Sequence, residues 1–171
     1  MKLALLLPII FLAGCVFNEP KETESIVIEI TGDYNRNLEG MIIRQEGYQR
    51  HPYPDAKGTQ SVGYGRNLTT SGISEEEALM LLRNDIDRIE EALTARFPVF
   101  DRLDNTRRAV LISMTYGLGI QGISEFKDMW RNINSRDYLA AASEIIISDY
   151  CNQVGMRCIE LASMMGSGKW R

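Results

Sequence analysis

The stretch EGYQRHPYPDAKGTQSVGYGR, residues 46–66, separates one helical pattern before it from a long series of helical patterns after it. The prolines within 51–55 push the residues before them into an extended conformation, and Lys57-Gly58 is typical of a turn. Residues 61–65 have the composition of a strand, with glycines that let another group approach the backbone closely. We therefore expect a small antiparallel hairpin sheet here.

Two carboxylates lie in this stretch. Glu46 ends a helical pattern that begins at Asn37, and Asp55 follows nine residues later in the turn. In the last turn of a helix, before Gly47, the negative end of the helix dipole disfavours the ionised form of Glu46, as a general acid at neutral pH requires. Cleavage of a glycosidic bond uses such an acid with a second carboxylate that directs water or attacks the sugar. The simpler interpretations are an exposed surface Glu46 and an Asp55 that bonds its own turn.

The rest of the chain is predicted to be helical. Ser74 and Glu77 form a capping-box pattern before a long amphipathic helix that Pro98 closes. Asp104 is expected to cap the next helix, which is apolar on nearly all sides and therefore central to the domain. We expect the glycines at 117, 119 and 122 to break this helix, and further helices to cover residues 126–133, 137–147 and about 156–165.

The first residues, MKLALLLPIIFLAGC, read as a secretory signal rather than as part of the fold. Their ending resembles the bacterial lipobox, which implies cleavage before Cys15 and lipidation of that cysteine. An ordinary cleaved signal or an uncleaved signal-anchor are the alternatives. We divide the chain into a signal peptide (1–14), a lipidated cysteine with a tether (15–36) and a catalytic domain (37–171). Within the tether, residues 25–31 have strand composition and Gly32-Asp33 that of a turn.

Composition limits the classes of function. The chain has 171 residues, 44% of them hydrophobic and 25% charged, which suits one globular domain. Its formal charge is -4, and removal of residues 1–14 would leave 18 basic and 23 acidic residues. A chain of this sign has no general attraction for nucleic acid. His51 is the only histidine, which excludes a histidine-rich metal site, and we expect no metal or cofactor.

From about Leu38 to Trp170 the sequence resembles the phage-type lysozymes, the muramidases of tailed bacteriophages. The order and spacing of the matching residues over about four-fifths of the chain carry the resemblance more than any single motif. They are Glu46-Gly47, Asp55, Ser61, Gly63-Tyr64-Gly65, Leu103-Asp104, Arg107-Arg108-Ala109, Met114, Gly119, Asn152-Gln153, Arg157 and Gly168-Lys169-Trp170.

The resemblance implies a two-lobed α+β fold, with a small antiparallel hairpin lobe, a larger helical lobe, a long helix that joins them and a cleft between. It also implies hydrolysis of the β-1,4 bond between N-acetylmuramic acid and N-acetylglucosamine in peptidoglycan, leading to wall degradation and host cell lysis. By the same resemblance Glu46 is the general acid, and Asp55 supports positive charge on the sugar and orients water. Ser61, in place of a threonine, supplies a water-binding hydroxyl. An inverting mechanism of this kind predicts carboxyl groups about 6.5–9.5 Å apart.

Other cleft residues are carried over from the family with some departures. Tyr64, Arg66, Asn152 and Gln153 are expected to line the cleft, with Arg66 where relatives often have histidine. Arg157 matches an arginine that pairs with the catalytic glutamate, although such a cation favours the ionised carboxylate and so opposes the helix dipole. Gly117 stands where a glutamine lines the cleft in relatives, so some substrate contacts are expected to be missing.

The three cysteines leave two interpretations open. If Cys15 is lipidated, Cys151 and Cys158 are the thiols left to pair in an oxidising compartment, and pairing requires a helix break that Gly155 could supply. Alternatively, an unlipidated Cys15 bonds one of them and places the enzyme under redox control. We expect the protein to be exported, anchored by lipid to the envelope facing the periplasm, and monomeric. Val16 favours the outer membrane in a Gram-negative host.

Two further functions compete with the muramidase hypothesis. A peptidoglycan-binding lipoprotein of the same fold, with little or no turnover, would account for Ser61, Gly117 and the acidic balance. A lytic transglycosylase needs one acid and no water-directing carboxylate, so Asp55 argues against it. The presence of both carboxylates favours the hydrolase.

Overall fold

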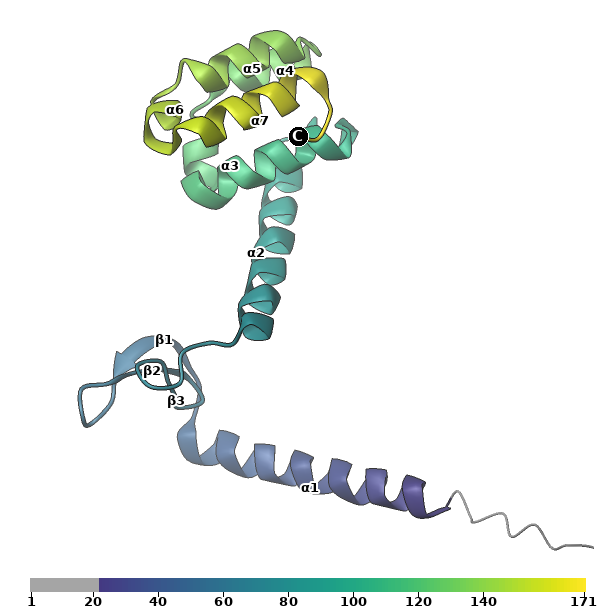
Figure 1. The fold of residues 1–171 in the computed structure, drawn as a ribbon, viewed down its shortest axis with the longest axis vertical. Coiled ribbons are helices and arrows are strands. Elements are labelled where there is room, and N and C mark those ends of the chain that lie inside the picture. Colours follow the sequence, from purple (N-terminus) through teal and green to yellow (C-terminus); the bar gives the residue numbers. More distant parts are fainter. Residues whose placement is uncertain (1–21) are drawn as a thin grey trace, which may run out of the picture. The chain divides into compact units, whose positions relative to one another are not determined.

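The computed structural model describes the backbone of residues 22–171 and the side chains from Asp33 onward. The chain divides into two compact units, Met1–Gly72 and Ile73–Arg171, and each is described by itself. The secondary structure is mostly helical, with one small antiparallel sheet in the first unit (Figure 1). The fold class is therefore α+β, as the sequence predicts.

The described part of the first unit, residues 22–72, consists of one helix followed by three short strands. Helix α1 covers Glu22–Glu46, and the strands are β1 (Gln49–Pro54), β2 (Gln60–Gly63) and β3 (Arg66–Asn67). The sheet order is β1-β2-β3 and both pairings are antiparallel, so the predicted hairpin sheet is confirmed. Ser61 on the central strand lies opposite Tyr53 on β1 and Asn67 on β3.

The strand predicted over residues 25–31 is wrong, and so is the turn at Gly32-Asp33, because α1 runs continuously through both. β-branched residues lower helix propensity only slightly, and residues 37–46 already provide a helix nucleus from which further turns can propagate. The boundary expected between residues 36 and 37 thus falls inside a helix. The predicted signal peptide and Cys15 lie outside the described residues. No helix in the described part of the chain has the length and apolar content to cross a membrane.

The second unit is helical throughout. Its long first helix begins with the predicted capping box, which is confirmed: the Glu77 amide donates to Ser74 Oγ at 3.2 Å, and the Ser74 amide donates to Glu77 Oε2 at 2.7 Å. The elements of this unit are α2 (Glu75–Arg96), the 3-10 helix η1 (Phe100–Arg102), α3 (Asn105–Ser124), α4 (Lys127–Asn134), α5 (Tyr138–Ile146), α6 (Asp149–Val154) and α7 (Met156–Ser167).

Helix α3 departs from the prediction at its glycines. Asp104 caps the helix as expected, by accepting a hydrogen bond from the Arg107 amide at 3.0 Å. Of the three glycines, only Gly119 leaves the helical conformation, at φ 68° and ψ 169°, and the helix continues beyond it to Ser124. The glycines therefore produce one kink rather than the end of the helix.

The core of the second unit lies among α3, α4, α5 and α7, which Figure 1 shows gathered together. Met114 of α3, Ile133 of α4 and Met165 of α7 are fully buried in it. Trp130 stacks on Phe97 with ring centroids 3.7 Å apart and donates its indole N–H to the Ile123 carbonyl at 2.9 Å. Met114, Met129, Met164 and Met165 thus act as core-filling side chains.

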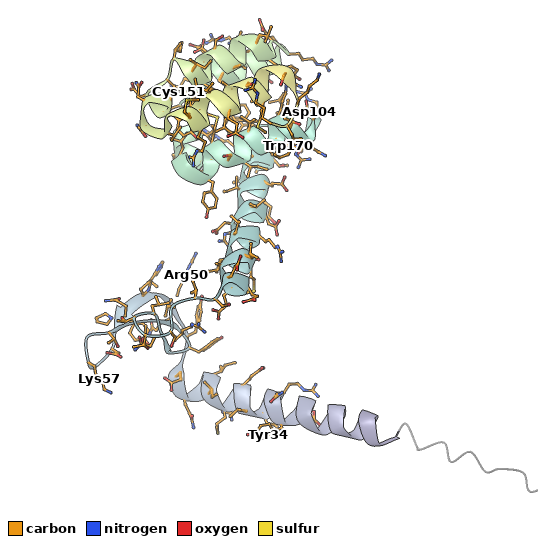
Figure 2. The ribbon with its side chains drawn as sticks, viewed as in Figure 1. Tyr34, Arg50, Lys57, Asp104, Cys151 and Trp170 are labelled. Atoms are coloured by element: carbon orange, nitrogen blue, oxygen red, sulfur yellow. A yellow bond between two sulfur atoms is a disulfide. The ribbon has the colours of Figure 1, made fainter. Side chains whose placement is uncertain are left out.

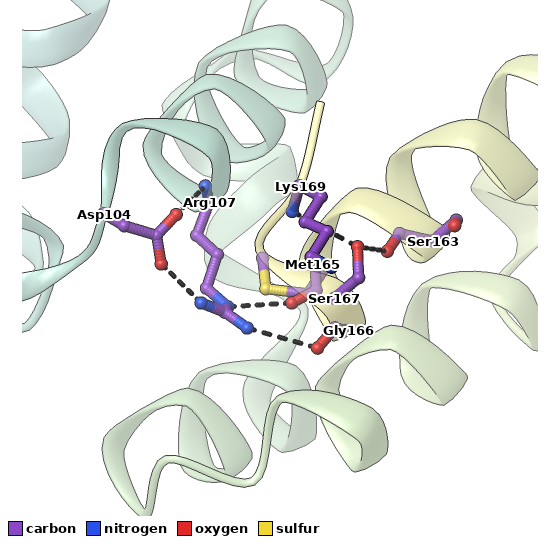
Figure 3. A network of polar contacts seen from close by, with 7 residues as sticks. All are labelled: Asp104, Arg107, Ser163, Met165, Gly166, Ser167 and Lys169. Carbon is purple, nitrogen blue, oxygen red and sulfur yellow. Dashed lines mark hydrogen bonds and ion pairs between the residues drawn. The ribbon is translucent and has the colours of Figure 1, made fainter. Parts of the chain in front are cut away.

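Arg107 joins the start of α3 to the end of α7 (Figure 3). Its guanidinium pairs with Asp104 and donates to the carbonyls of Met165 at 2.8 Å and Gly166 at 3.1 Å. Burial works against the ionised form of Asp104, but hydrogen bonds from Arg107 and its charge outweigh burial and lower the pKa of Asp104. The cation satisfies carbonyls at the end of α7, where a helix leaves them unpaired.

Candidate active site

Glu46 is the last residue of α1, and its side chain is exposed. The helix stops there because Gly47 takes a left-handed conformation, at φ 66°, and donates its amide to the Ile43 carbonyl at 3.1 Å. Gly65, in the turn between β2 and β3, lies against the Glu46 carboxylate: a Cβ atom on Gly65 would be 2.9 Å from Glu46 Oε2. Of the two glycines within 61–65, Gly65 thus shows the expected close approach, and the group that approaches it is the predicted general acid.

Asp55 is half-buried in the turn between β1 and β2, where Figure 2 labels its neighbour Lys57. Its Oδ1 accepts the amides of Lys57 at 2.8 Å and Thr59 at 2.9 Å, and its Oδ2 accepts the Thr59 hydroxyl. The hydrogen bond from the Thr59 hydroxyl, followed by those from backbone amides, lowers the pKa of Asp55 below its ordinary value. This carboxylate is accordingly ionised at neutral pH.

Thr59 and Asn67 support Asp55, and neither was predicted as a site residue. Asn67 Nδ2 donates to Thr59 Oγ1 at 3.0 Å, which leaves the hydroxyl hydrogen for Asp55. An aspartate with a threonine four residues later in a glycine-containing turn is a signal that could have identified Thr59. Asn67 had no such signal, because it reaches the turn from β3. The turn-bonding interpretation of Asp55 and the catalytic one are thus compatible.

The other predicted residues of the first unit lie on β2 or beside it. Ser61 is buried, with 4% of its surface exposed. The Tyr64 ring is exposed, and its centroid lies 5.6 Å from that of Tyr48. Arg66 donates its Nε hydrogen to the Gly72 carbonyl at 2.8 Å and so secures the end of this unit. Ser61, Tyr64 and Arg66 thus follow one another along β2, the β2–β3 turn and the start of β3.

Asn152, Gln153 and Arg157 belong to the second unit, at the junction of α6 and α7. Helix α6 was not predicted, because the sequence pattern of six residues is too short to define a helix. Gly155 separates the two helices at φ 59° and ψ -131°. Cys151 and Cys158 form a disulfide across this break, with Cα atoms 5.0 Å apart. Figure 2 labels Cys151. The rival bond to Cys15 is therefore not the pairing in this structure.

Arg157 lies close to two other residues of the second unit. Its Nη2 donates to the Tyr150 hydroxyl at 3.4 Å, and a Cβ atom on Gly117 would be 3.5 Å from the same nitrogen. Tyr150 is buried and was not predicted as part of the site. Gly117 thus leaves room beside Arg157 where a larger residue would contact it. The pairing of Arg157 with Glu46, which lies in the other unit, stays a prediction.

A groove of about 660 Å³ lies among α3, α4, α5 and α6, and its lining includes Leu118, Phe126, Tyr150 and Gln153. Its size is within the range of sites that bind small molecules, about 300–1,000 Å³. Gln153 therefore borders a hollow on the surface of the second unit. In the part of the chain that the structure describes, no cluster of three or more His, Cys, Asp or Glu residues is arranged to hold a metal ion.

The fold is thus α+β, with an ionised aspartate in the β1–β2 turn, a glutamate at the end of α1 and a separate helical unit. The chain belongs to the phage lysozyme family, whose sequence profile matches residues 43–161. It is also similar to a "Probable T4-type lysozyme 2" of Dictyostelium discoideum, with 21% identity over 162 residues, covering 77% of this chain and 95% of that protein. The family and this relative support a glycosidase of the muramidase type.

Proposed function

We propose that this protein is a lysozyme that hydrolyses the β-1,4 bond between N-acetylmuramic acid and N-acetylglucosamine in peptidoglycan. Glu46 donates a proton to the leaving oxygen, and Asp55, as the carboxylate, stabilises positive charge on the sugar and orients a water molecule. The Ser61 hydroxyl assists in holding that water, and Arg157 positions Glu46. Tyr64, Arg66, Asn152 and Gln153 contact the glycan.

One observation carries the proposal: Asp55 and Glu46 have different surroundings. Three hydrogen bonds hold the Asp55 carboxylate in its ionised form. Glu46 is instead exposed at the end of α1, with the backbone of Gly65 close to its carboxylate. A pair of carboxyl groups in unlike environments is what separates an acid from a charge-stabilising carboxylate in glycoside hydrolysis.

The mechanism we propose is inverting. A water molecule directed by Asp55 attacks the anomeric carbon on the face opposite the leaving oxygen, which takes the proton from Glu46. The first product of a β-linked substrate is then the α anomer of N-acetylmuramic acid. NMR spectra taken early in the reaction distinguish this anomer from the β anomer that a retaining enzyme would release.

We also propose that the protein is exported and attached by lipid on Cys15 to the bacterial envelope, facing the periplasm, where it acts on the wall as a monomer. The signal-like residues 1–14 and the lipobox-like ending at Cys15 support this placement. Degradation of the wall from this position would lead to lysis of the host cell.

The deciding experiment is digestion of purified peptidoglycan by the full-length protein in detergent, with the released sugar ends identified by mass spectrometry. We expect reducing N-acetylmuramic ends, and a rate about 10²–10⁴-fold lower for Glu46→Gln, the range that general acid catalysis usually contributes. Glu39→Gln, at another exposed glutamate of α1, is the matched control and should keep wild-type activity.

Three results would contradict the proposal. Anhydro sugar ends would identify a lytic transglycosylase. Retention on peptidoglycan without release of sugars would identify a wall-binding lipoprotein instead. Equal activity of wild type and Glu46→Gln would show that Glu46 is not the general acid.

A further inference from the structure

The backbone of the β2–β3 turn comes unusually close to the carboxylate of Glu46. A Cβ atom on Gly65 would lie 2.9 Å from Glu46 Oε2, 3.4 Å from its carboxyl carbon and 3.6 Å from Cγ. Real Cβ atoms essentially never approach another heavy atom within 3.0 Å. The carboxylate therefore occupies space that any side chain at position 65 would need.

We propose that Gly65 is a positioning residue for the general acid: because it has no side chain, the Glu46 carboxylate rests against the backbone of the turn and is directed by it. This inference rests on the proposed function, since it takes Glu46 as the proton donor. Gly65 itself does not touch the reacting atoms.

The Glu46 carboxylate needs such a contact because its side chain would otherwise be free to adopt unproductive orientations. The side chain has several rotatable bonds and therefore many rotamers. Because it is exposed at the end of a helix, few neighbours restrict these rotamers. Proton transfer requires the acid within hydrogen-bond reach of the leaving oxygen, and a misplacement of about 1 Å can lower a rate by about 10²-fold. A backbone wall on one side of the carboxylate removes some of the orientations that would be unproductive.

A methyl group at position 65 should move the acid rather than unfold the turn. The atoms that it would meet belong to the far end of a flexible side chain, not to backbone. Gly65→Ala has a second effect, because Gly65 adopts φ 76°, a conformation that L-residues disfavour. A test must therefore separate displacement of Glu46 from backbone strain.

Alanine at position 63 separates backbone strain from displacement of Glu46. Gly63 lies two residues earlier, at the end of β2, and adopts φ 67°, so alanine there suffers similar strain. In the described part of the chain, however, no heavy atom lies within 4 Å of a Cβ on Gly63. Gly63→Ala thus carries the backbone effect without contact with Glu46.

The experiment compares wild type, Gly65→Ala, Gly63→Ala and Glu46→Gln, each as the full chain. Melting temperatures should fall by a similar amount in the two glycine variants, about 2–8 °C. On soluble, uncrosslinked peptidoglycan strands, we expect kcat of Gly65→Ala to fall by about 10²-fold with little change in KM, while Gly63→Ala keeps most of its kcat. Crystal structures should show the Glu46 carboxylate displaced in Gly65→Ala only.

Equal losses of kcat in the two glycine variants would overturn the inference, as would a Glu46 carboxylate that keeps its place in Gly65→Ala. Failure of the proposed function is a separate result. If wild type released no sugar, the proposed activity would fail, and the crystal structures would still decide whether Gly65 directs Glu46.

Discussion

At the scale of single residues, the properties of Asp55 depend on Thr59. The hydroxyl of Thr59 is the largest cause of the lowered pKa of Asp55, and Asn67 orients that hydroxyl from β3. Because the folded-state pKa lies below the unfolded one, these hydrogen bonds stabilise the fold at neutral pH. Their contribution is lost as the pH falls through the folded-state pKa.

Thr59→Val should raise the pKa of Asp55, because it removes the hydroxyl donor and keeps the backbone donors. The low-pH limb of the activity profile should then shift to higher pH, since Asp55 would become protonated sooner as the medium is acidified. NMR titration of the Asp55 carboxyl group and the pH dependence of kcat/KM measure the two shifts. Thr59→Ser retains the hydroxyl and is the control. An unchanged titration of Asp55 in Thr59→Val would refute this account.

At the scale of secondary structure elements, the disulfide between Cys151 and Cys158 holds α6 against α7. Both Asn152 and Gln153 lie within the loop that it closes, and Arg157 precedes Cys158 directly. The bond spans the break at Gly155 between the two helices. It therefore constrains the three predicted cleft residues of the second unit together.

Reduction of this disulfide should lower the free energy of unfolding by about 2–3 kcal/mol, because a covalent loop restricts the unfolded chain. Denaturant titrations with and without a reductant measure the change. The double variant Cys151→Ala/Cys158→Ala is the control, since its stability should not respond to the reductant. A response of the same size in that variant would assign the effect to another part of the protein.

At the scale of the whole molecule, charge and anchoring are linked. The formal charge of -4 provides no general attraction to an anionic cell wall. Attachment to the envelope would instead raise the local concentration of the enzyme near its substrate. The proposed lipid anchor thus takes the place of the long-range electrostatic attraction that a basic protein would have.

Cys15→Ser should move the protein from the membrane fraction to the soluble fraction and reduce lysis of cells that express it. Its activity on isolated peptidoglycan should be unchanged, because no residue of the candidate site is altered. Fractionation and labelling with a radioactive fatty acid test the first effect, and turbidity of the culture tests the second. Asn18→Ser, three residues later, is the control. Incorporation of label into Cys15→Ser would contradict lipidation at Cys15.

Local features were determined by the sequence itself. The capping box of Ser74 and Glu77 and the caps at Asp104 and Gly47 follow from residues within a few positions of one another, and the β1–β2 hairpin follows from the turn that joins its strands. Their backbone conformations depend on short-range hydrogen bonds and steric limits, which the printed sequence reveals. Glu46 and Asp55 were identified for the same reason, as residues in a recurring local pattern.

Other features were decided only by the tertiary structure. The support of Asp55 from Asn67, the contact of Gly65 with Glu46 and the place of Tyr150 beside Arg157 join residues that the sequence separates. The extension of α1 over residues 25–31 overrides a strand-like composition, because composition is a weak preference and helix growth from residues 37–46 is cooperative. Local sequence patterns therefore identify the candidate residues of this protein, while the packing of separate segments determines which groups surround them.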